Sequence, residues 1–481
     1  MVVRNSIFMS RRPAAKRSMI LALLVFQSLG GCQPSGDSQA RNALESRGDI
    51  VLITLDTTRA DHLSSYGYFR DTTPNLDALA RESVVFEQVI APVAHTLPSH
   101  ISLFTGTYPF EHGVTANAAQ AGGVFRPSPH LESLAEVLAR NGYATAGFVA
   151  AEPLKKPSGA ELGFEYWWQP EATKVDADRV TELALEYLKE RDDDRPLFLW
   201  VHYYDPHAPY RPPDPFSEMF EVDDGLEALI AERGIREPRQ RPQRSVQEER
   251  GRKRRFEDTR TDLNAYDGEL RFMDQEIGRL LDHFRGPTWE DLLVLVTADH
   301  GEALGQHGKT GHGSFWLEQL RVPLLMKIPG QSPRQIPGMM SSVAFLPTLA
   351  GLAPHLPLEE LVAQSTERDA LGPEGPRDII TMLPSSRSKQ TLSILSGAWR
   401  WIEESQGETQ HLYALDQDPS ETDNVHRAHP EVTQQLSELL EARVREQRAN
   451  GRKNEAGRLL TTSDGEAGQR AKRLEALGYV Q

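Results

Sequence analysis

The chain has 481 residues, a formal net charge of −16 and a single cysteine, with 39% hydrophobic and 25% charged residues. This length accommodates one large α/β domain and a smaller appendage, and the composition is ordinary for a globular protein. The acidic balance argues against a nucleic-acid partner, and one cysteine excludes disulfides within the chain and thiolate metal sites.

The first 31 residues predict an export signal. An apolar run, Met19–Phe26, follows four basic residues, Arg11, Arg12, Lys16 and Arg17, and leads to Leu29-Gly-Gly-Cys32. The run is too short to span a bilayer, and the pattern is typical of a bacterial lipoprotein cleaved before Cys32 and lipidated on it. Residues 32–48 are polar and predict a flexible tether. We therefore expect an exported protein, periplasmic or at the cell surface, with a lipid anchor in the membrane; an uncleaved anchor or a stray cysteine is the alternative.

The first half of the remaining chain predicts alternating strands and helices. The run Asp49–Asp56 is apolar, rich in β-branched residues and ends in an acid, which is typical of a buried parallel strand with a functional residue at its carboxyl end. Further predicted elements are a helix over 74–80, a strand over 84–90, a helix that begins near Pro98, a helix over 131–141 and a strand over 144–150.

The alternation continues in the second half. The predicted elements are a helix around 180–188, a strand over 197–203, a long amphipathic helix over 263–280, and strands over 292–297 and 322–328. This order predicts an α/β fold with a mostly parallel central sheet and helices on both faces. Polar residues follow several strand ends, which is where open α/β sheets place their sites.

Two regions depart from this pattern. Residues 211–260 are rich in Pro, Arg and Glu and predict a charged, solvated insertion, or alternatively a lid or a patch around Arg252–Arg255 that attracts anions. Beyond about 375 the sequence predicts short strands, with a hairpin from 398–402 and 411–415, and a helix over 430–445. We therefore predict a main domain over 49–375 and a small C-terminal α+β subdomain with a tail over 376–481.

The segment His95-Thr-Leu-Pro-Ser-His100, followed by Thr105-Gly106, resembles the nucleophile motif of the sulfatase branch of the alkaline phosphatase superfamily. Pro98, Ser99, Thr105 and Gly106 fall on the family pattern. Thr96 stands where a sulfatase has the Cys or Ser that becomes formylglycine, and His100 stands where it has arginine. The extra methyl group on the Cβ atom of threonine prevents oxidation to that aldehyde. The resemblance therefore implies a sulfatase-like fold without formylglycine.

The resemblance also implies a divalent metal site. Asp56, and Asp299 with His300 in the segment Thr297–Glu302, match the family's ligands, and the Thr96 oxygen would complete the set. The single acid before Thr57 and the histidine at position 300 resemble the pattern of phosphonate monoester hydrolase and phosphodiesterase relatives. A site of oxygens with one nitrogen favours Zn or Mn and allows Ca.

Three further residues match the family one by one. His207, in the segment Asp205-Pro-His207, would protonate the leaving group, His312 would contact the substrate anion, and Asn117 would bind the substrate. His100 would take over part of the role of the missing arginine. Alternatively, Asp205, His207 and His312 would hold a second metal ion, as in two-metal phosphatases.

Together these features predict a metal-dependent ester hydrolase that uses Thr96 as a direct nucleophile on phosphate mono- or diesters. The alternatives are a sulfuric ester hydrolase that works without formylglycine, a phospho-headgroup transferase, and an anion- or sugar-binding protein without activity. The expected partner is an anionic ester substrate, phosphate or sulfate. Nothing in the sequence predicts the oligomeric state.

Overall fold

The computed structural model describes residues 48–118, 124–220, 225–233, 259–383, 390–404, 409–456 and 459–460. The predicted signal peptide (1–31), Cys32, the basic run 252–255 and the predicted tail beyond 460 lie outside the described residues. No helix in the described ranges is long and apolar enough to cross a membrane.

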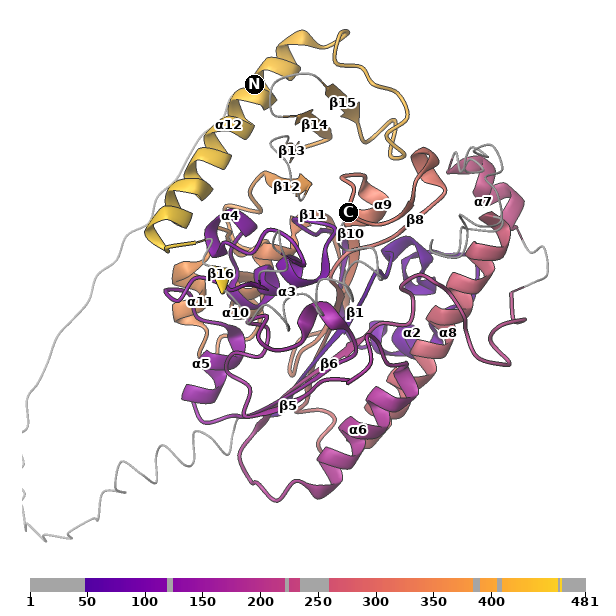
Figure 1. Ribbon diagram of the computed structural model, residues 1–481, viewed down its shortest axis with the longest axis vertical. Helices are drawn as coiled ribbons and strands as arrows, with labels where there is room; N and C mark the ends of the chain where they lie inside the picture. The colour runs from indigo at the N-terminus through magenta and orange to yellow at the C-terminus, as the bar shows by residue number, and fades with distance from the viewer. Residues whose placement is uncertain are drawn as a thin grey trace, which may run out of the picture. The chain divides into compact units, whose positions relative to one another are not determined.

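An eight-stranded sheet organises the fold (Figure 1). In spatial order its strands are β11 (Arg334–Ser341), β2 (Val84–Ile90), β10 (Arg321–Lys327), β7 (Leu293–Ala298), β1 (Ile50–Leu55), β6 (Leu197–Tyr203), β4 (Ala144–Val149) and β5 (Tyr166–Trp168). All neighbours pair in parallel except β10, which is antiparallel to both β2 and β7. The prediction of a mostly parallel sheet is therefore confirmed.

The direction of β10 follows from the connection that leads to it. Between β7 and β10 the chain forms only short elements, including α9 (Leu317–Leu320), and no long crossover helix. Parallel neighbours need a crossover of a dozen or more residues, usually a helix that returns the chain to the starting edge. Here the connection stays at the carboxyl edge of β7, and the chain enters β10 from that edge.

Helices cover both faces of this sheet, as predicted (Figure 1). One layer contains α2 (Pro74–Ala80), α6 (Ala177–Glu190) and α8 (Thr259–Phe284), and the other contains α3 (Thr96–Thr105), α5 (Leu134–Arg140), α10 (Phe345–Leu352) and α11 (Glu359–Gln364). Because both faces are covered, β1, β4, β6 and β7 are buried along their whole length, which explains their apolar sequences.

Local signals explain where these elements begin and end. Helix α5 starts after Ser133, whose hydroxyl accepts the Glu136 N–H while the Glu136 carboxylate accepts the Ser133 N–H, a reciprocal capping box. The turn after α5 uses Gly142 at φ 90°, a left-handed conformation that glycine adopts readily. The sequence predicted α2, β2 and β6 with their observed bounds.

The C-terminal part forms a separate antiparallel sheet. Strands β12 (Ile379–Leu383), β13 (Thr391–Ser396), β14 (Trp399–Glu404) and β15 (Gln410–Ala414) pair in chain order, which confirms the predicted hairpin. Helix α12 (Pro430–Lys453) extends beyond the predicted end at 445 and buries Leu436 and Leu440 against Ile394 and Trp401. The exact domain boundary near 376 stays a prediction.

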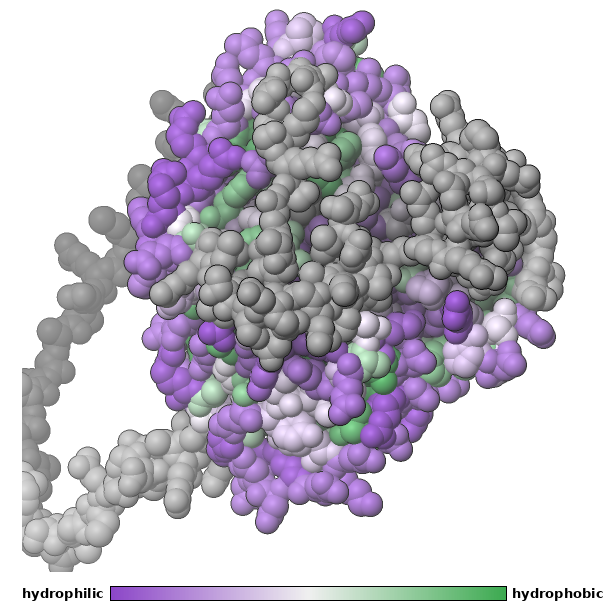
Figure 2. All heavy atoms as spheres, viewed as in Figure 1, coloured by the Kyte–Doolittle hydropathy of each residue, from purple (hydrophilic) through white to green (hydrophobic). Residues whose placement is uncertain are grey.

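The predicted insertion at 211–260 is partly packed rather than fully solvated. Phe216 is 7% exposed and its ring lies 5.5 Å from that of Phe272 on α8. Leu226, the first residue of α7 (Leu226–Glu232), is also buried. On the face shown in Figure 2 hydrophilic side chains predominate among the coloured residues. The other short α-helices and strands in the described residues are α4 (Pro109–His112), β3 (Val124–Phe125), β8 (Ala303–Leu304), β9 (Thr310–Gly311) and β16 (Leu459–Leu460).

Candidate active site

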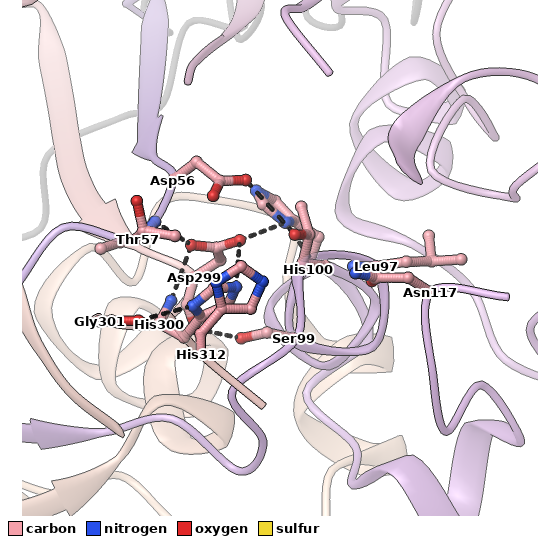
Figure 3. A network of polar contacts seen from close by, with 12 residues as sticks. Asp56, Thr57, Leu97, Ser99, His100, Asn117, Asp299, His300, Gly301 and His312 are labelled. Atoms are coloured by element: carbon pink, nitrogen blue, oxygen red, sulfur yellow. Dashed lines mark hydrogen bonds and ion pairs between the residues drawn. The ribbon is translucent and has the colours of Figure 1, made fainter. Parts of the chain in front are cut away.

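Three predicted metal ligands meet at the carboxyl edge of the large sheet (Figure 3). Strands β1 and β7 pair in parallel with Leu55 beside Ala298, so the next residues, Asp56 and Asp299, leave the sheet side by side. Asp56, Asp299 and His300 are all buried and offer ligand atoms within 4.8 Å of one another. Within the described residues this is the only group of three or more His, Cys, Asp or Glu side chains with such spacing.

The hydrogen bonding of this cluster fits a divalent cation. Asp56 Oδ1, Asp299 Oδ2 and His300 Nε2 are buried atoms without a hydrogen-bond partner. The His300 ring donates Nδ1–H to the carbonyl of Gly301 at 2.9 Å, which places its lone pair on Nε2. Burying polar atoms without partners is costly, and two carboxylates with one imidazole form the donor set that a divalent ion would satisfy.

Burial also explains the proton affinity of the two acids. It raises the pKa of Asp56 to about 7, against the lowering influence of His312 and His100. The pKa of Asp299 is raised by burial first and by the charge of Asp56 second. A cation bound between the two carboxylates would favour the ionised form of both.

A strained turn sets the position of Asp56. Thr57, the next residue, has φ 50°, a left-handed conformation that is costly for a β-branched residue. Its N–H donates to Asp299 Oδ1 at 3.2 Å, and its carbonyl accepts the hydroxyl of Tyr266 at 2.9 Å. These two bonds hold the turn, so Asp56 and Asp299 are fixed relative to each other through the backbone.

Thr96 lies directly beside this cluster. It is the first residue of α3, it is fully buried, and its Oγ1 lies 3.4 Å from Asp56 Oδ2. Ser99, one turn later, donates its hydroxyl to the carbonyl of Asp299 at 2.6 Å. That bond joins the first turn of α3 to the residue after β7, which holds Thr96 beside the two acids.

Asn117 lies at the same helix start. Its Oδ1 accepts the N–H of Leu97 at 2.7 Å, which fixes the orientation of the amide, and its Nδ2 is buried without a partner. The amide therefore satisfies one of the open N–H groups of α3 and keeps a donor for an anion.

His207 and His312 lie together near His300. The ring of His312 is 4.6 Å from that of His300 and 4.9 Å from that of His207. His207 donates Nδ1–H to the carbonyl of Ala208 at 2.7 Å, and His312 Nδ1 lies 3.4 Å from Glu302 Oε2. In both rings the Nδ1 proton is directed at an oxygen, so Nε2 is the atom that can exchange a proton or contact an anion.

Comparison with known proteins identifies this arrangement. The sulfatase pattern matches residues 48–355, more than half of the chain and all of the site residues above. The chain belongs to the sulfatase family. The family is part of the alkaline phosphatase superfamily, whose members include ester hydrolases that use a divalent metal.

The relatives include a multifunctional superfamily protein, a phosphonate monoester hydrolase and sulfatases. The multifunctional alkaline phosphatase superfamily protein PehA of Trinickia caryophylli is 26% identical over 385 residues, 63% of this chain and 73% of that protein. The ulvan-active sulfatase of Formosa agariphila is 26% identical and covers 69% of this chain and 67% of its own length. The phosphonate monoester hydrolase of Agrobacterium radiobacter superimposes with a TM-score of 0.64 at 21% identity, covering 83% of this chain and 96% of that one. A putative sulfatase of Bacteroides fragilis gives a TM-score of 0.68 at 19% identity, covering 84% and 96%.

His100 occupies the arginine position of the sulfatase motif in a different way. Its Nδ1 lies 2.8 Å from the carbonyl of Thr96, and its Nε2 lies 3.0 Å from the hydroxyl of Thr54. Burial lowers its pKa to about 3, so the ring is neutral. A neutral ring with both nitrogens bonded inside the protein does not carry the charge of an arginine. The geometry favours a role in holding the start of α3, although Nδ1 also lies 3.8 Å from Asp299 Oδ2.

The alternative second metal site receives no geometric support. Asp205 Oδ1 accepts the N–H of Ala177 at 2.9 Å, at the start of α6. Asp205, His207 and His312 form no group with metal-ligand spacing within the part of the chain that the structure describes.

Two site residues were missed by the sequence reasoning. His202, on β6, lies with Nε2 3.4 Å from Asp56 Oδ2 and is fully buried. A histidine directly after the apolar run Leu197–Val201, within the same predicted strand 197–203, was the available signal, because such a strand buries every side chain. Glu302 was recognised as part of the motif 297–302 but was given no role. Its contact with His312 depends on how the loop after β7 folds back.

Proposed function

We propose that this sulfatase-family hydrolase acts on phosphate mono- or diesters with Thr96 as the direct nucleophile and with Asp56, Asp299 and His300 holding a divalent ion. The observation that carries the proposal is the Thr96 hydroxyl, 3.4 Å from Asp56, at the position where a formylglycine precursor would stand. Because threonine cannot form the aldehyde, attack by its hydroxyl oxygen is the covalent chemistry that this position offers.

The residues present account for both halves of such a reaction. Thr96 Oγ1 attacks phosphorus and forms a new O–P bond while the bond from phosphorus to the leaving oxygen breaks. The Thr96 proton passes to Asp56 Oδ2, which accepts this hydroxyl at 3.4 Å, and a His207 ring protonated on both nitrogens gives its Nε2 proton to the leaving oxygen. Water then attacks phosphorus and gives a proton to His207 Nε2, the bond to Thr96 breaks, and Thr96 regains its proton from Asp56. Asn117 and the N-terminus of α3 favour the transferred anion. A bound divalent ion supplies positive charge to the non-bridging oxygens and lowers the pKa of the attacking hydroxyl.

Chemistry favours phosphorus over sulfur as the reacting centre. A hydroxyl that attacks a sulfate ester leaves a sulfo-threonine that is hard to hydrolyse, whereas a phospho-threonine can turn over. The likeness to PehA and to the fold of a phosphonate monoester hydrolase supports the same choice. The oxygen-rich ligand set with one imidazole favours Zn or Mn, with Ca as a further candidate.

The second candidate is sulfate-ester hydrolysis with the same nucleophile. Several curated relatives favour it, since they include the ulvan-active sulfatase and the choline-sulfatase of Rhizobium meliloti, which is 26% identical over 411 residues. In that case Thr96 would attack sulfur directly, and formylglycine would still play no part.

One assay separates these two candidates. The purified protein, a Thr96→Ala variant and a Thr105→Ala control would be tested with Zn, Mn and Ca on nitrophenyl phosphate, phosphate diester, phosphonate ester and sulfate. Thr105 is a buried threonine of the same helix whose hydroxyl bonds to Ile101 and Thr107, away from the acids. We expect turnover of phosphorus esters that requires Thr96 and not the Thr105 hydroxyl. Dominant sulfate turnover that depends on Thr96 would overturn the phosphoesterase proposal and leave the second candidate.

The covalent step has its own test. Rapid acid quenching during turnover, followed by mass spectrometry, should find a phosphorylated peptide whose modified residue is Thr96. The same peptide from a Thr96→Ala reaction provides the baseline. An unmodified peptide under conditions of steady turnover would argue for direct attack by water instead.

We further propose that the protein is exported and anchored through a lipid on Cys32. This rests on the sequence pattern of residues 11–32. A Cys32→Ala variant should leave the membrane fraction after cell disruption, and its unchanged retention there would place the anchor elsewhere.

A further inference from the structure

His202 reaches the candidate metal site from the strand next to Asp56. Strands β1 and β6 pair in parallel with Thr54 beside His202. The imidazole is completely buried and lies with Nε2 3.4 Å from Asp56 Oδ2. His202 has no role in the proposed reaction steps.

The backbone around His202 decides which ring nitrogen carries the proton. The N–H of Ala150, on the neighbouring chain segment after β4, points at His202 Nδ1 at 3.3 Å. Because a backbone N–H can only donate, Nδ1 must be the acceptor, and the proton of the neutral ring is on Nε2.

This protonation pattern is opposite to that of the other site histidines. In His300 and His207, Nδ1 donates to a carbonyl oxygen, and Nε2 carries the lone pair. His202 alone among these three presents an N–H group from Nε2. It therefore suits contact with a carboxylate and does not suit direct ligation of a cation through that atom.

The two oxygens of Asp56 have different surroundings. Oδ2 accepts the Thr96 hydroxyl at 3.4 Å and lies at the same distance from His202 Nε2, which makes no hydrogen bond within the described part of this structure. Oδ1 is buried without a hydrogen-bond partner and belongs to the cluster with Asp299 and His300. One oxygen is thus directed at donors of the protein, and the other is left for a ligand.

We propose that His202 is a positioning residue: its buried Nε2–H, which has no other hydrogen-bond partner among the described residues, holds Asp56 at Oδ2, so that Oδ1 is presented to the divalent ion. The inference rests on the proposed metal site and adds a residue that does not touch the substrate. Partners of metal ligands fix the orientation of the ligand, and their loss typically weakens metal affinity about 10- to 100-fold.

A packing role is the competing explanation, because His202 also belongs to an aromatic cluster. Its ring lies 5.1 Å from that of His100 and 6.4 Å from that of Trp200. Two substitutions separate the roles. His202→Phe keeps a ring and removes the N–H, whereas His202→Gln removes the ring and keeps an N–H donor near the position of Nε2.

The test measures zinc and manganese affinity of the metal-stripped full-length protein by competition with a chromophoric chelator. Trp200→Phe is the matched control, an aromatic exchange two residues earlier on β6 that removes only the bond from Nε1 to the Thr54 hydroxyl. We expect His202→Phe to bind zinc about 10- to 100-fold more weakly. We expect His202→Gln and Trp200→Phe to stay within about threefold of the parent protein, because both keep a donor at Asp56.

Two results would overturn the inference while leaving the proposed function intact. The first is a His202→Phe variant with the metal affinity of the parent. The second is a His202→Gln variant as weak as His202→Phe, which would show that the ring and not the N–H matters. A parent protein that binds neither metal would instead overturn the proposed function itself, and the inference with it. Circular dichroism of each variant verifies that the fold is retained.

Discussion

Two buried clusters of this protein combine aspartate with histidine, and they differ in how their polar atoms are paired. In one cluster Asp267, on α8, accepts His62 Nδ1 at 2.8 Å on one oxygen and the hydroxyl of Tyr68 and the guanidinium of Arg70, both at 2.7 Å, on the other. In the second, Asp56 and Asp299 each have one oxygen without a hydrogen-bond partner.

The charges differ in the same way. Arg70 neutralises Asp267 inside the protein. Among the described residues the only ion-pair contacts of Asp56 and Asp299 are with histidines, and the neighbouring rings of His100, His202 and His300 all have a lowered pKa. A buried carboxylate with both oxygens paired suits a structural role, whereas buried carboxylates with unpaired oxygens suit a ligand site. The following predictions test that distinction.

The largest effect is expected for Asp56→Asn. Removing a ligand should cost several kcal/mol of transition-state stabilisation, about 1,000-fold or more in kcat/KM. The metal-free variant should be no less stable than the metal-free parent, because one of two neighbouring buried acids is gone. Urea unfolding without metal, together with steady-state kinetics, measures both quantities. A metal-free variant that unfolds at clearly lower urea would show that Asp56 is a structural residue.

The opposite behaviour is expected for Asp267→Asn. Its loss leaves the guanidinium of Arg70 buried without a counter-charge, which typically costs about 3–5 kcal/mol. The zinc affinity of the folded protein should not change. Urea unfolding and chelator competition measure the two effects. Parent-like stability would contradict a structural role for this cluster.

Metal binding should distinguish the clusters by its effect on stability. At a free zinc concentration of 100 times Kd, the free energy of unfolding should rise by about 2.7 kcal/mol in the parent protein. The same increment is expected in Asp267→Asn, and none in Asp56→Asn. Thermal or urea unfolding with zinc and with a chelator provides the measurement, and an equal increment in all three proteins would place the metal elsewhere.

The smallest effect on stability is expected for His307, a histidine outside both clusters whose two ring nitrogens both face acceptors. His307 Nδ1 lies 3.1 Å from Glu318 Oε1 and Nε2 lies 3.2 Å from the carbonyl of Glu421, so both nitrogens face acceptors and both bonds require the charged ring. Burial lowers its pKa, but the bond to Glu318 and the charges of Glu318 and Glu421 outweigh burial and raise it above 6.5. Glu421 also pairs with Arg400, the positive charge next to this carboxylate.

The sign of the pH dependence follows directly. Because the pKa of folded His307 is raised, its stabilising contribution is complete below the ordinary pKa of 6.5 and disappears as the pH rises through the folded value. The expected contribution is below about 1 kcal/mol because the ring is partly exposed. Asparagine tolerates the left-handed backbone at position 307, so His307→Asn should keep the fold. The variant should lose the decrease in the free energy of unfolding that the parent shows as the pH rises above 6.5. The exposed His130→Asn is the control and should leave the profile unchanged; equal profiles in all three proteins would exclude a charged His307.

Part of the site could be predicted from the sequence, because the end of a buried strand is marked by the residues at that point of the chain. The apolar runs before Asp56 and before Asp299 predicted parallel strands, and parallel strands bring their carboxyl ends to one edge. The structure places these acids and His300 in one cluster, with Thr96 at the start of the next helix, as the motifs suggested. The chemical roles of these residues stay predictions.

Other features were hidden because they depend on pairing between distant segments. His202 approaches Asp56 only through the register of β6 on β1, and its proton is placed by Ala150 on a third segment. The missed edge strands β5 and β11 consist mostly of intermediate or exposed residues, so their sequences lack the continuous apolar signal. The contacts of His100 with Thr54 and Thr96 could not be predicted, because they depend on how α3 packs next to β1.

By itself, the sequence determined the α/β class, most strand and helix positions, the family, and the acids and histidines that reach the sheet edge. Those features are local, because they depend on apolar periodicity, on turn residues and on motif spacing along the chain. The tertiary structure alone decided the reversed direction of β10, the neutral state of His100, the different surroundings of the two oxygens of Asp56, and the contrast between Asp267 and Asp56. These depend on which donors and acceptors lie within about 3–4 Å in space, a distance that is set by packing and not by position in the chain.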